Sequence, residues 1–357
     1  MLLKRSIFLL YFVLSFVPAY AEQNVYSNFD SIISSESVPI NDMLTGWENS
    51  YQRGEIVFAD VNWSFGFSSD LEIAGESFGQ LSVQREYRRY YYLNYDKETS
   101  DYFRALELGN ELTSNKKLDL AFKQFEAPGI TFGYESKKFQ MESINWQLGL
   151  GMSLYQPGHF QFGSIKGIAE AGEASAASGI INYRYDDDKL LDHQAEVDKG
   201  LGLSLSLMFA LELEHWRARV SVKDIINRFR WRNGAFTKGC INVGGGSRAQ
   251  CDADGAASGI SAQGEVVETI PYTLNAELSH INSGLVAYGM AHDEYYRLGV
   301  EKGVQTSLGR FAFFLYYPRL VGLSWQTSIF NIQLGADTLK FSQARNLQLN
   351  MGINWRW

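Results

Sequence analysis

Apolar and polar residues alternate along most of the chain beyond residue 56. In the stretches 57–67, 144–154 and 201–213, an apolar side chain occupies almost every second position, and most of the intervening residues are Ser, Gly, Asn or Gln. A period of two predicts β-strands, because successive side chains of a strand point to opposite faces. Strands of about 9 to 13 residues are longer than those of soluble sheets and fit a tilted strand that crosses roughly 25 Å of hydrocarbon.

Short connections join these strands into hairpins. Asn, Ser and Gly in such connections are typical of tight β-turns. The predicted hairpins turn at Glu214-His215, at 282–284 within the stretch 272–292, and near Ser328-Ile329 within the stretch 310–340.

Helical signals are few. The stretch 28–33 predicts a short helix, and the stretch 101–112 is either another short helix or the continuation of a strand. Residues 22–54 lack the alternation and are interpreted as a separate N-terminal segment.

The alternation predicts an all-β protein, a transmembrane antiparallel up-and-down β-barrel of about 12 to 14 strands. In a soluble sandwich the face opposite the apolar one would carry many charges. Here that face is mostly small and neutral, which suits an enclosed interior. A sheet edge exposed to lipid would leave backbone groups without hydrogen bonds, so the sheet must close.

The N-terminus has the features of an export signal. Lys4 and Arg5 precede an apolar run, and the small residues Ala19 and Ala21 fit a cleavage site after Ala21. The alternative is an uncleaved membrane anchor, but the run is shorter than the roughly 20 residues that span a bilayer. The residue directly after the cleavage site is not Cys, which argues against a lipid anchor there. The expected divisions are 1–21 as a signal peptide, 22–54 as a periplasmic or plug segment, and 55–357 as the barrel.

The C-terminus alternates to its last residue. In NLQLNMGINWRW, residues 346–357, every second side chain is apolar. The spacing of Asn350, Gly352, Trp355 and Trp357 resembles the C-terminal assembly signal of bacterial outer-membrane barrels. This resemblance implies a Gram-negative outer membrane as the location, surrounded by lipid and lipopolysaccharide, and the barrel assembly machinery as a partner.

Charge limits the partners. The signal peptide holds two of the 32 basic residues and none of the 40 acidic ones, so the remaining chain has a net charge of −10. This balance argues against nucleic acid and against anionic membrane surfaces as partners. Arg85 and Arg89 do not fit a lipid-facing position at mid-depth, which places their Tyr-rich strand partly beyond the membrane or at an aromatic girdle.

Two cysteines, Cys240 and Cys251, lie in a Gly-rich segment. In an exported protein such a pair predicts one disulfide that closes a loop. A metal site would need further ligands nearby, and the segment contains none.

Acidic side chains cluster over 186–198, where Asp186, Asp187, Asp188 and Asp192 stand close together. The run lacks the spacing of a calcium-binding loop. It is interpreted as solvated loop charge, with contact to cations at a pore mouth as the alternative. The triplet His292-Asp293-Glu294 is a further candidate for metal binding, although no metal or cofactor is predicted overall.

No catalytic residue is predicted. The stretch 75–79, GESFG, fits the pattern of a nucleophile elbow, but that motif requires a strand before it, a helix after it and a surrounding α/β sheet. It is interpreted as a turn. The five histidines are scattered along the chain.

Three phrases in the C-terminal half resemble a known family. The stretches 219–231, 272–280 and 295–303 are similar to the long-chain fatty-acid transporter (FadL-like) superfamily of barrels, whose relatives include barrels tied to secretion and to conjugative transfer. The resemblance implies a barrel and a transport role.

Three functional hypotheses follow. The first is a passive channel or transporter for small or hydrophobic solutes. The second is a non-enzymatic accessory barrel of a surface, secretion or conjugative-transfer assembly, and the third, an enzyme, is disfavoured. A wide lumen with charged rings would favour the first, and a lumen filled by side chains the second. The pattern does not select an oligomeric state.

Overall fold

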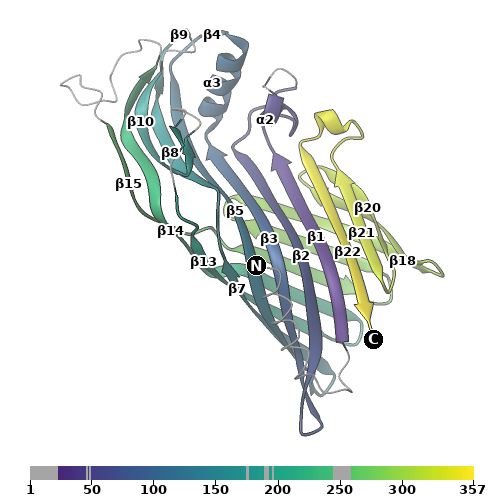
Figure 1. Ribbon diagram of the computed structural model, residues 1–357. Coiled ribbons are helices and arrows are strands. Elements are labelled where there is room, and N and C mark those ends of the chain that lie inside the picture. The colour runs from purple at the N-terminus through teal and green to yellow at the C-terminus, as the bar shows by residue number, and fades with distance from the viewer. Residues whose placement is uncertain are drawn as a thin grey trace.

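The chain folds into a closed antiparallel ring of 14 strands (Figure 1). The structure is a computed structural model that describes residues 23–45, 47, 50–173, 177–188, 193–194, 197–243 and 259–357. No helix among these residues is long and apolar enough to cross a membrane. The ring consists of β1 (Gln23–Ser35), β2 (Ile56–Ile73), β3 (Glu76–Tyr95), β5 (Lys116–Ser136), β7 (Ile144–Tyr155), β13 (Leu201–Glu212), β14 (Trp216–Val243), β16 (Thr273–His280), β17 (Leu285–His292), β18 (Tyr295–Thr306), β19 (Gly309–Tyr317), β20 (Leu320–Gln326), β21 (Phe330–Ala336) and β22 (Asn346–Arg356).

Strand β1 closes the ring. It pairs along its length with β2 on one side and with β22 on the other. The expectation of a separate periplasmic or plug segment over 22–54, with a short helix over 28–33, was therefore wrong for residues 23–35. The outward face of β1 carries Ser27 and Ser31 between its apolar residues, and these serines weaken the alternation that marks the other strands.

Other elements agree with their predictions. The turns at Glu214-His215, at 281–284 and at 327–329 separate adjacent strands. Residues 74 and 75 form the turn between β2 and β3, so the GESFG stretch is a turn and the start of a strand.

Helix α3 (Lys97–Leu108) fills the connection from β3 to β5. Asp96 caps its N-terminus by accepting a hydrogen bond from the Thr99 amide at 2.7 Å, and Gly109 ends it in the left-handed conformation with φ of 63°. The helical alternative is thus correct for 101–108, whereas Glu111–Leu112 form the short strand β4. A second, four-residue helix is α2 (Asp42–Thr45), and η1 (Phe341–Gln343) is a short 3₁₀ turn.

The two ends of the ring differ. Both ends of the described chain lie at the lower end, where the connections are short, and the longest described connections, 36–55 and 96–115, lie at the upper end with α3 (Figure 1). Outer-membrane barrels have short periplasmic turns and longer extracellular loops. The upper end corresponds by this criterion to the external end of such a barrel.

The wall has unequal height. β5 and β14 continue above the ring, where they pair with additional strands into an upper sheet (Figure 1). We call β2, β3, β5, β7, β13 and β14 the long wall, and β16 to β22 with β1 the short wall. The upper sheet adds β8 (Phe160–Ala169), β10 (Ala177–Tyr185) and β15 (Gly259–Glu268), and the remaining short strands are β4 (Glu111–Leu112), β6 (Phe139–Met141), β9 (Gly172–Glu173), β11 (Asp187–Asp188) and β12 (His193–Gln194).

The outer surface of the ring is apolar. Alternate residues of each strand point away from the lumen, and large apolar side chains on them are exposed. In water such a surface would be costly, whereas lipid covers it without loss. Representative outward residues are Phe65, Phe132, Leu150, Leu207, Val300, Phe313, Leu323 and Ile353.

Candidate functional site

Aromatic side chains fill the lumen at the height where the long wall meets the rim of the short wall. Each of them is 3% exposed or less. We call this layer the aromatic diaphragm, and its members are Phe58, Tyr90, Phe125, Phe160, Phe229, Trp231 and Tyr295.

The rings of the diaphragm touch in sequence across the lumen. On the long wall, the ring centroids of Phe160 and Trp231 are 4.4 Å apart, and those of Phe125 and Phe229 are 4.6 Å apart. Phe58 of β2 lies 4.8 Å from Tyr295 of β18, although these strands are not neighbours in the ring. Side chains from opposite walls therefore meet and close the lumen.

A buried ion network adjoins the diaphragm. The guanidinium of Arg88, fully buried, donates to both carboxylate oxygens of Asp60 at 3.0 and 2.9 Å, and its Nη1 donates to Asp224 at 3.1 and 2.8 Å. Ser204 donates to Asp224 at 2.6 Å, and Lys223 lies 3.6 Å from Asp60. Removal of each ion from water costs several kcal/mol, and these paired carboxylates and hydrogen bonds offset that cost.

A bulge in β14 directs Asp224 into the lumen. The register with β13 shifts between Leu205 and Leu207, and Asp224 adopts the left-handed conformation with φ of 61°. Bulges redirect side chains, and Asp tolerates this conformation better than most residues. The local backbone thus places a carboxylate of β14 opposite Arg88 of β3.

A second polar bridge holds Tyr90 and the short wall together. The Tyr90 hydroxyl and His292 Nε2 are 2.8 Å apart, and His292 Nδ1 lies 2.8 Å from Thr273 Oγ1. The imidazole also packs against Phe58 at 4.7 Å between ring centroids. The triplet that begins at His292 does not form a metal site, because this ring is engaged on both nitrogens and Glu294 accepts from Asn94 at 2.7 Å.

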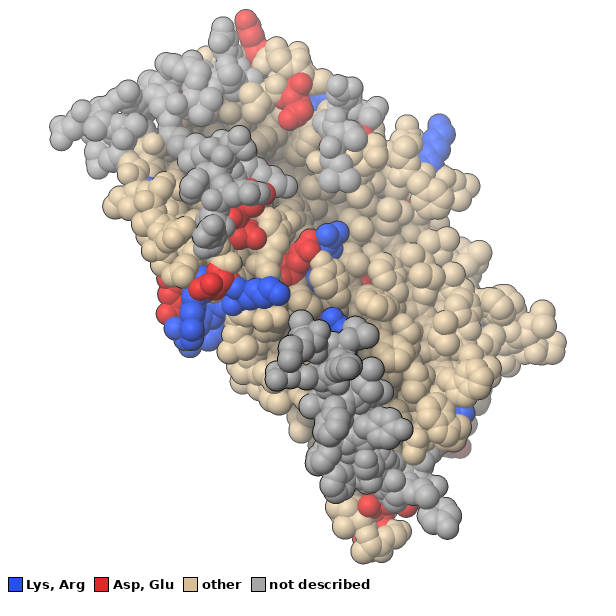
Figure 2. Space-filling model, in the orientation of Figure 1, with Lys and Arg blue, Asp and Glu red and all other residues tan. Residues whose placement is uncertain are grey.

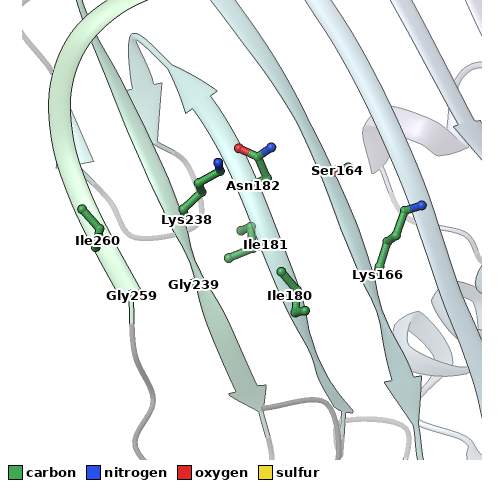
Figure 3. Close-up of a pocket in the computed structure, with 9 residues that line it drawn as sticks. All are labelled: Ser164, Lys166, Ile180, Ile181, Asn182, Lys238, Gly239, Gly259 and Ile260. Carbon is green, nitrogen blue, oxygen red and sulfur yellow. The ribbon is translucent and has the colours of Figure 1, made fainter. Parts of the chain in front are cut away.

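A pocket of about 560 Å³ opens on the upper sheet (Figure 3). Lys238 lies beside Asn182, its register partner, and Lys166 stands at the opposite side on β8. Ser164 shares the lumen face of β8 with Phe162, a residue that packs against the diaphragm, so the pocket lies directly above the closed layer. The lining residues are Ser164, Lys166, Ile180, Ile181, Asn182, Lys238, Gly239, Gly259 and Ile260.

The short wall carries its own buried cation. Arg297 is 1% exposed and donates to Gln348 Oε1 at 2.7 Å across the lumen, and its guanidinium lies near the rings of Tyr295 and Tyr316. Among the described residues it forms no ion pair. The two walls therefore hold their arginines in different ways, one by two carboxylates and the other by a neutral amide and two rings.

The C-terminal residues predicted as an assembly signal lie on both faces of β22. Asn350 points inward and donates to Gln333 at 2.9 Å, while Trp355 and Trp357 point outward and are 63% and 58% exposed. A Cβ on Gly352 would lie 2.2 Å from the side-chain amide oxygen of Asn331, so a larger residue there would require the Asn331 side chain to move. Recognition by the assembly machinery stays a prediction.

The structure disperses the other predicted residues. Asp186 pairs with His159 at 2.8 Å, and Asp187 belongs to β11. The side chain of Asp188 and all of Asp192 lie outside the described residues, as does Cys251, the expected partner of Cys240 on β14. The cation contact and the disulfide therefore stay predictions. No group of three metal-binding side chains occurs within the described ranges.

Sequence reasoning missed the residues that close the lumen. It singled out Arg85 and Arg89, both exposed on the outer face, and passed over Arg88 between them. The period of two was the available signal, since Glu86, Arg88 and Tyr90 share the face opposite Arg85.

No protein-family model and no curated protein matches the chain. Among solved structures, it is similar to two variants of the TodX monoaromatic hydrocarbon channel at 8% identity, with 96% of this chain and 91% of that chain covered and TM-scores of 0.37 and 0.39. It is also similar to the outer membrane protease OmpT from Escherichia coli at 7% identity, with 95% and 97% covered and a TM-score of 0.22. The chain is a transmembrane β-barrel of 14 antiparallel strands. Membership of the FadL-like superfamily stays a prediction.

Proposed function

We propose that the barrel is a passive channel for small hydrophobic solutes and that the aromatic diaphragm is its gate. The observation that supports this most is the pocket on the upper sheet, which lies on the same lumen face as the diaphragm and directly above it. A solute that enters from outside meets apolar side chains first and aromatic rings next.

The diaphragm suits apolar solutes better than ions. Aromatic rings offer a moving apolar molecule favourable contacts, whereas an ion that leaves water for such a layer loses several kcal/mol of hydration. The residues of the layer are side chains of the wall, so passage would begin with a change of rotamer in rings such as Phe58 and Phe125. The Arg88 network keeps the walls aligned beside the layer while the rings move.

A solute that passes through the channel must bind the pocket weakly enough to leave it again. Ile180 and Ile260 are 54% and 67% exposed, which gives a solute a shallow apolar surface to occupy and to leave. Lys166 and Lys238 at its margin keep that surface hydrated on one side. No catalytic role is proposed for this site.

A second candidate function is an anchor or accessory barrel in a larger assembly. The closed lumen favours it, because a barrel that only anchors has no need of a passage. The two candidates differ in one property, since only the channel admits apolar molecules to the cell.

Uptake of a hydrophobic fluorophore by intact Gram-negative cells tests the proposal. N-phenyl-1-naphthylamine fluoresces when it passes an outer membrane that normally excludes it. Cells that express the barrel are expected to take it up faster than cells without it, and Ile180→Asn with Ile260→Asn should lower that rate. Leu339→Asn, an exposed apolar residue in the connection before β22, is the matched control.

Equal barrel content is verified by the gel mobility of the folded protein before and after heating. Uptake no faster than in cells without the barrel would reject the channel and leave the anchor as the better account.

A further inference from the structure

Arginines stand on the outer face of the long wall, where the lipid-facing surface ends. On β3 the outward residue above Val83 is Arg85, and on β14 the outward residue above Ile226 is Arg228. Arg89 lies two outward positions above Arg85 on β3, and Arg230 lies one outward position above Arg228 on β14. We call Arg85, Arg89, Arg228 and Arg230 the arginine band.

Strand pairing connects the two sides of the band. Arg85 is paired with Ile130, Ile130 with Leu154, Leu154 with Leu203, and Leu203 with Arg228. One row across five adjacent strands thus has an arginine at each end and three aliphatic side chains between. Neighbouring strands lie about 4.8 Å apart, so the ends of the row are roughly 19 Å from each other.

The band has more cations than the described carboxylates neutralise. Arg89 pairs with Glu126 at 2.7 Å, and Arg230 pairs with Glu265 at 2.8 Å. Arg85 and Arg228 are exposed and form no ion pair within the described part of the chain. Figure 2 shows basic side chains with adjoining acidic ones gathered on this face, over the middle of the long wall.

The position of the band limits what it can meet. Below it the surface is apolar and faces lipid, and above it lies the upper sheet at the external end. A long arginine side chain rooted near the edge of the apolar surface extends its guanidinium toward the polar headgroups. The charge of the whole chain, which argued against anionic membrane surfaces, does not apply to this local surface.

We propose that the arginine band binds the phosphate groups of phosphorylated lipids in the outer leaflet, the chemistry that lipopolysaccharide presents. Guanidinium groups bind phosphate through paired hydrogen bonds, and the aliphatic residues between Arg85 and Arg228 accommodate acyl chains of the same lipid. Arg89 and Arg230, each held by a carboxylate, flank the two unpaired arginines. The inference is independent of the transport function.

The test is a binding titration in neutral detergent micelles with fluorescent lipid A as the probe. EDTA is present throughout so that divalent ions do not bridge phosphate to carboxylates. The double variant Arg85→Gln/Arg228→Gln is compared with wild type and with Lys137→Gln/Lys138→Gln, which removes two cations at the lower end. Gel mobility before and after heating confirms that each variant is folded.

Loss of the two unpaired arginines is expected to weaken binding about thirtyfold, since each basic residue near an anionic surface contributes about fivefold. The lower-end variant should change binding less than twofold. Dephosphorylated lipid A should bind wild type and the double variant equally.

Two results would overturn the proposal. Equal affinity of wild type for phosphorylated and dephosphorylated lipid A would show that acyl chains alone are bound. Inorganic phosphate that competes as well as lipid A at the same concentration would show a site for a free anion and not for a lipid. If the double variant does not fold, Arg228→Gln alone is titrated, with an expected loss of about fivefold.

Discussion

The long wall and the short wall are built from the same alternation, yet they supply different interiors. The long wall contributes six of the seven diaphragm rings and the fully paired Arg88, counting its upward continuation in β8. The short wall contributes Tyr295, the His292 bridge and an inner surface of amides such as Gln333 and Gln348, which hydrogen-bond to each other at 3.1 Å.

This difference shows that the outer face and the inner face of a barrel are subject to different physical constraints. Lipid requires only that outward residues be apolar, and both walls meet that condition. The lumen requires that side chains from different strands match in size and charge. Closure therefore depends on a few residues, above all Arg88 with its two carboxylates and the rings of Phe58 and Phe125.

The sharpest contrast between the walls lies in their buried arginines. Arg88→Met leaves the carboxylates of Asp60 and Asp224 buried without their cation, so the free energy of unfolding should fall by about 3 to 5 kcal/mol. Arg297→Met removes a cation held by a neutral amide and should cost about 1 kcal/mol. Urea titrations of both variants check this. Equal losses would mean that the two sites are not held differently.

The pairing of β1 with β22, which closes the ring, provides the next test. Successive residues of β1 face lipid and lumen in turn. Phe29→Lys places a charge on the outer face of β1 and should lower the free energy of unfolding by about 2 to 4 kcal/mol in a bilayer. Asn28→Lys, on the lumen face of the same strand, should cost less. Urea midpoints of both variants are measured in lipid. A lower midpoint for Asn28→Lys than for Phe29→Lys would contradict the assigned faces.

The sequence was informative about faces and uninformative about pairing across the lumen. Clean alternation in 201–213 predicted β13 correctly, whereas Ser27 and Ser31 hid the alternation of β1. Arg85 and Arg89 drew attention as misfits on a lipid face, and the structure places them outward as that pattern requires. The partnership of Arg88 with Asp224 joins residues 136 positions apart and depends on a bulge, for which the local pattern has no signature.

A smaller effect is expected where the long wall continues above the ring. Asp96→Ala removes the N-terminal cap of α3 and should destabilise that helix by about 1 kcal/mol. Hydrogen exchange should accelerate in α3 and remain unchanged in the short wall. Glu107→Ala, an exposed residue in the last turn of the helix, is the control and should leave exchange unaltered.

The smallest effect concerns pH at the same upper end. Partial burial opposes ionisation of Asp101, but hydrogen bonds from Arg53 and Tyr51 outweigh it and hold the pKa of the Asp101 carboxyl below its ordinary value. A lowered pKa contributes stability above the unfolded value of about 3.9, and this contribution is lost as pH falls through the folded value. Proteolysis of the α3 connection should increase below about pH 4 in wild type, and less so in Asp101→Asn.

The central claim is that side chains of the diaphragm close the lumen, and single-channel conductance in a planar bilayer tests it most directly. Wild type is expected to be silent. Phe58→Ala/Phe125→Ala should show stepwise currents, while Phe65→Ala/Phe132→Ala, with the same residue types on the outer faces of the same two strands, should stay silent. A steady current through wild type, or silence of the folded diaphragm variant, would contradict the account.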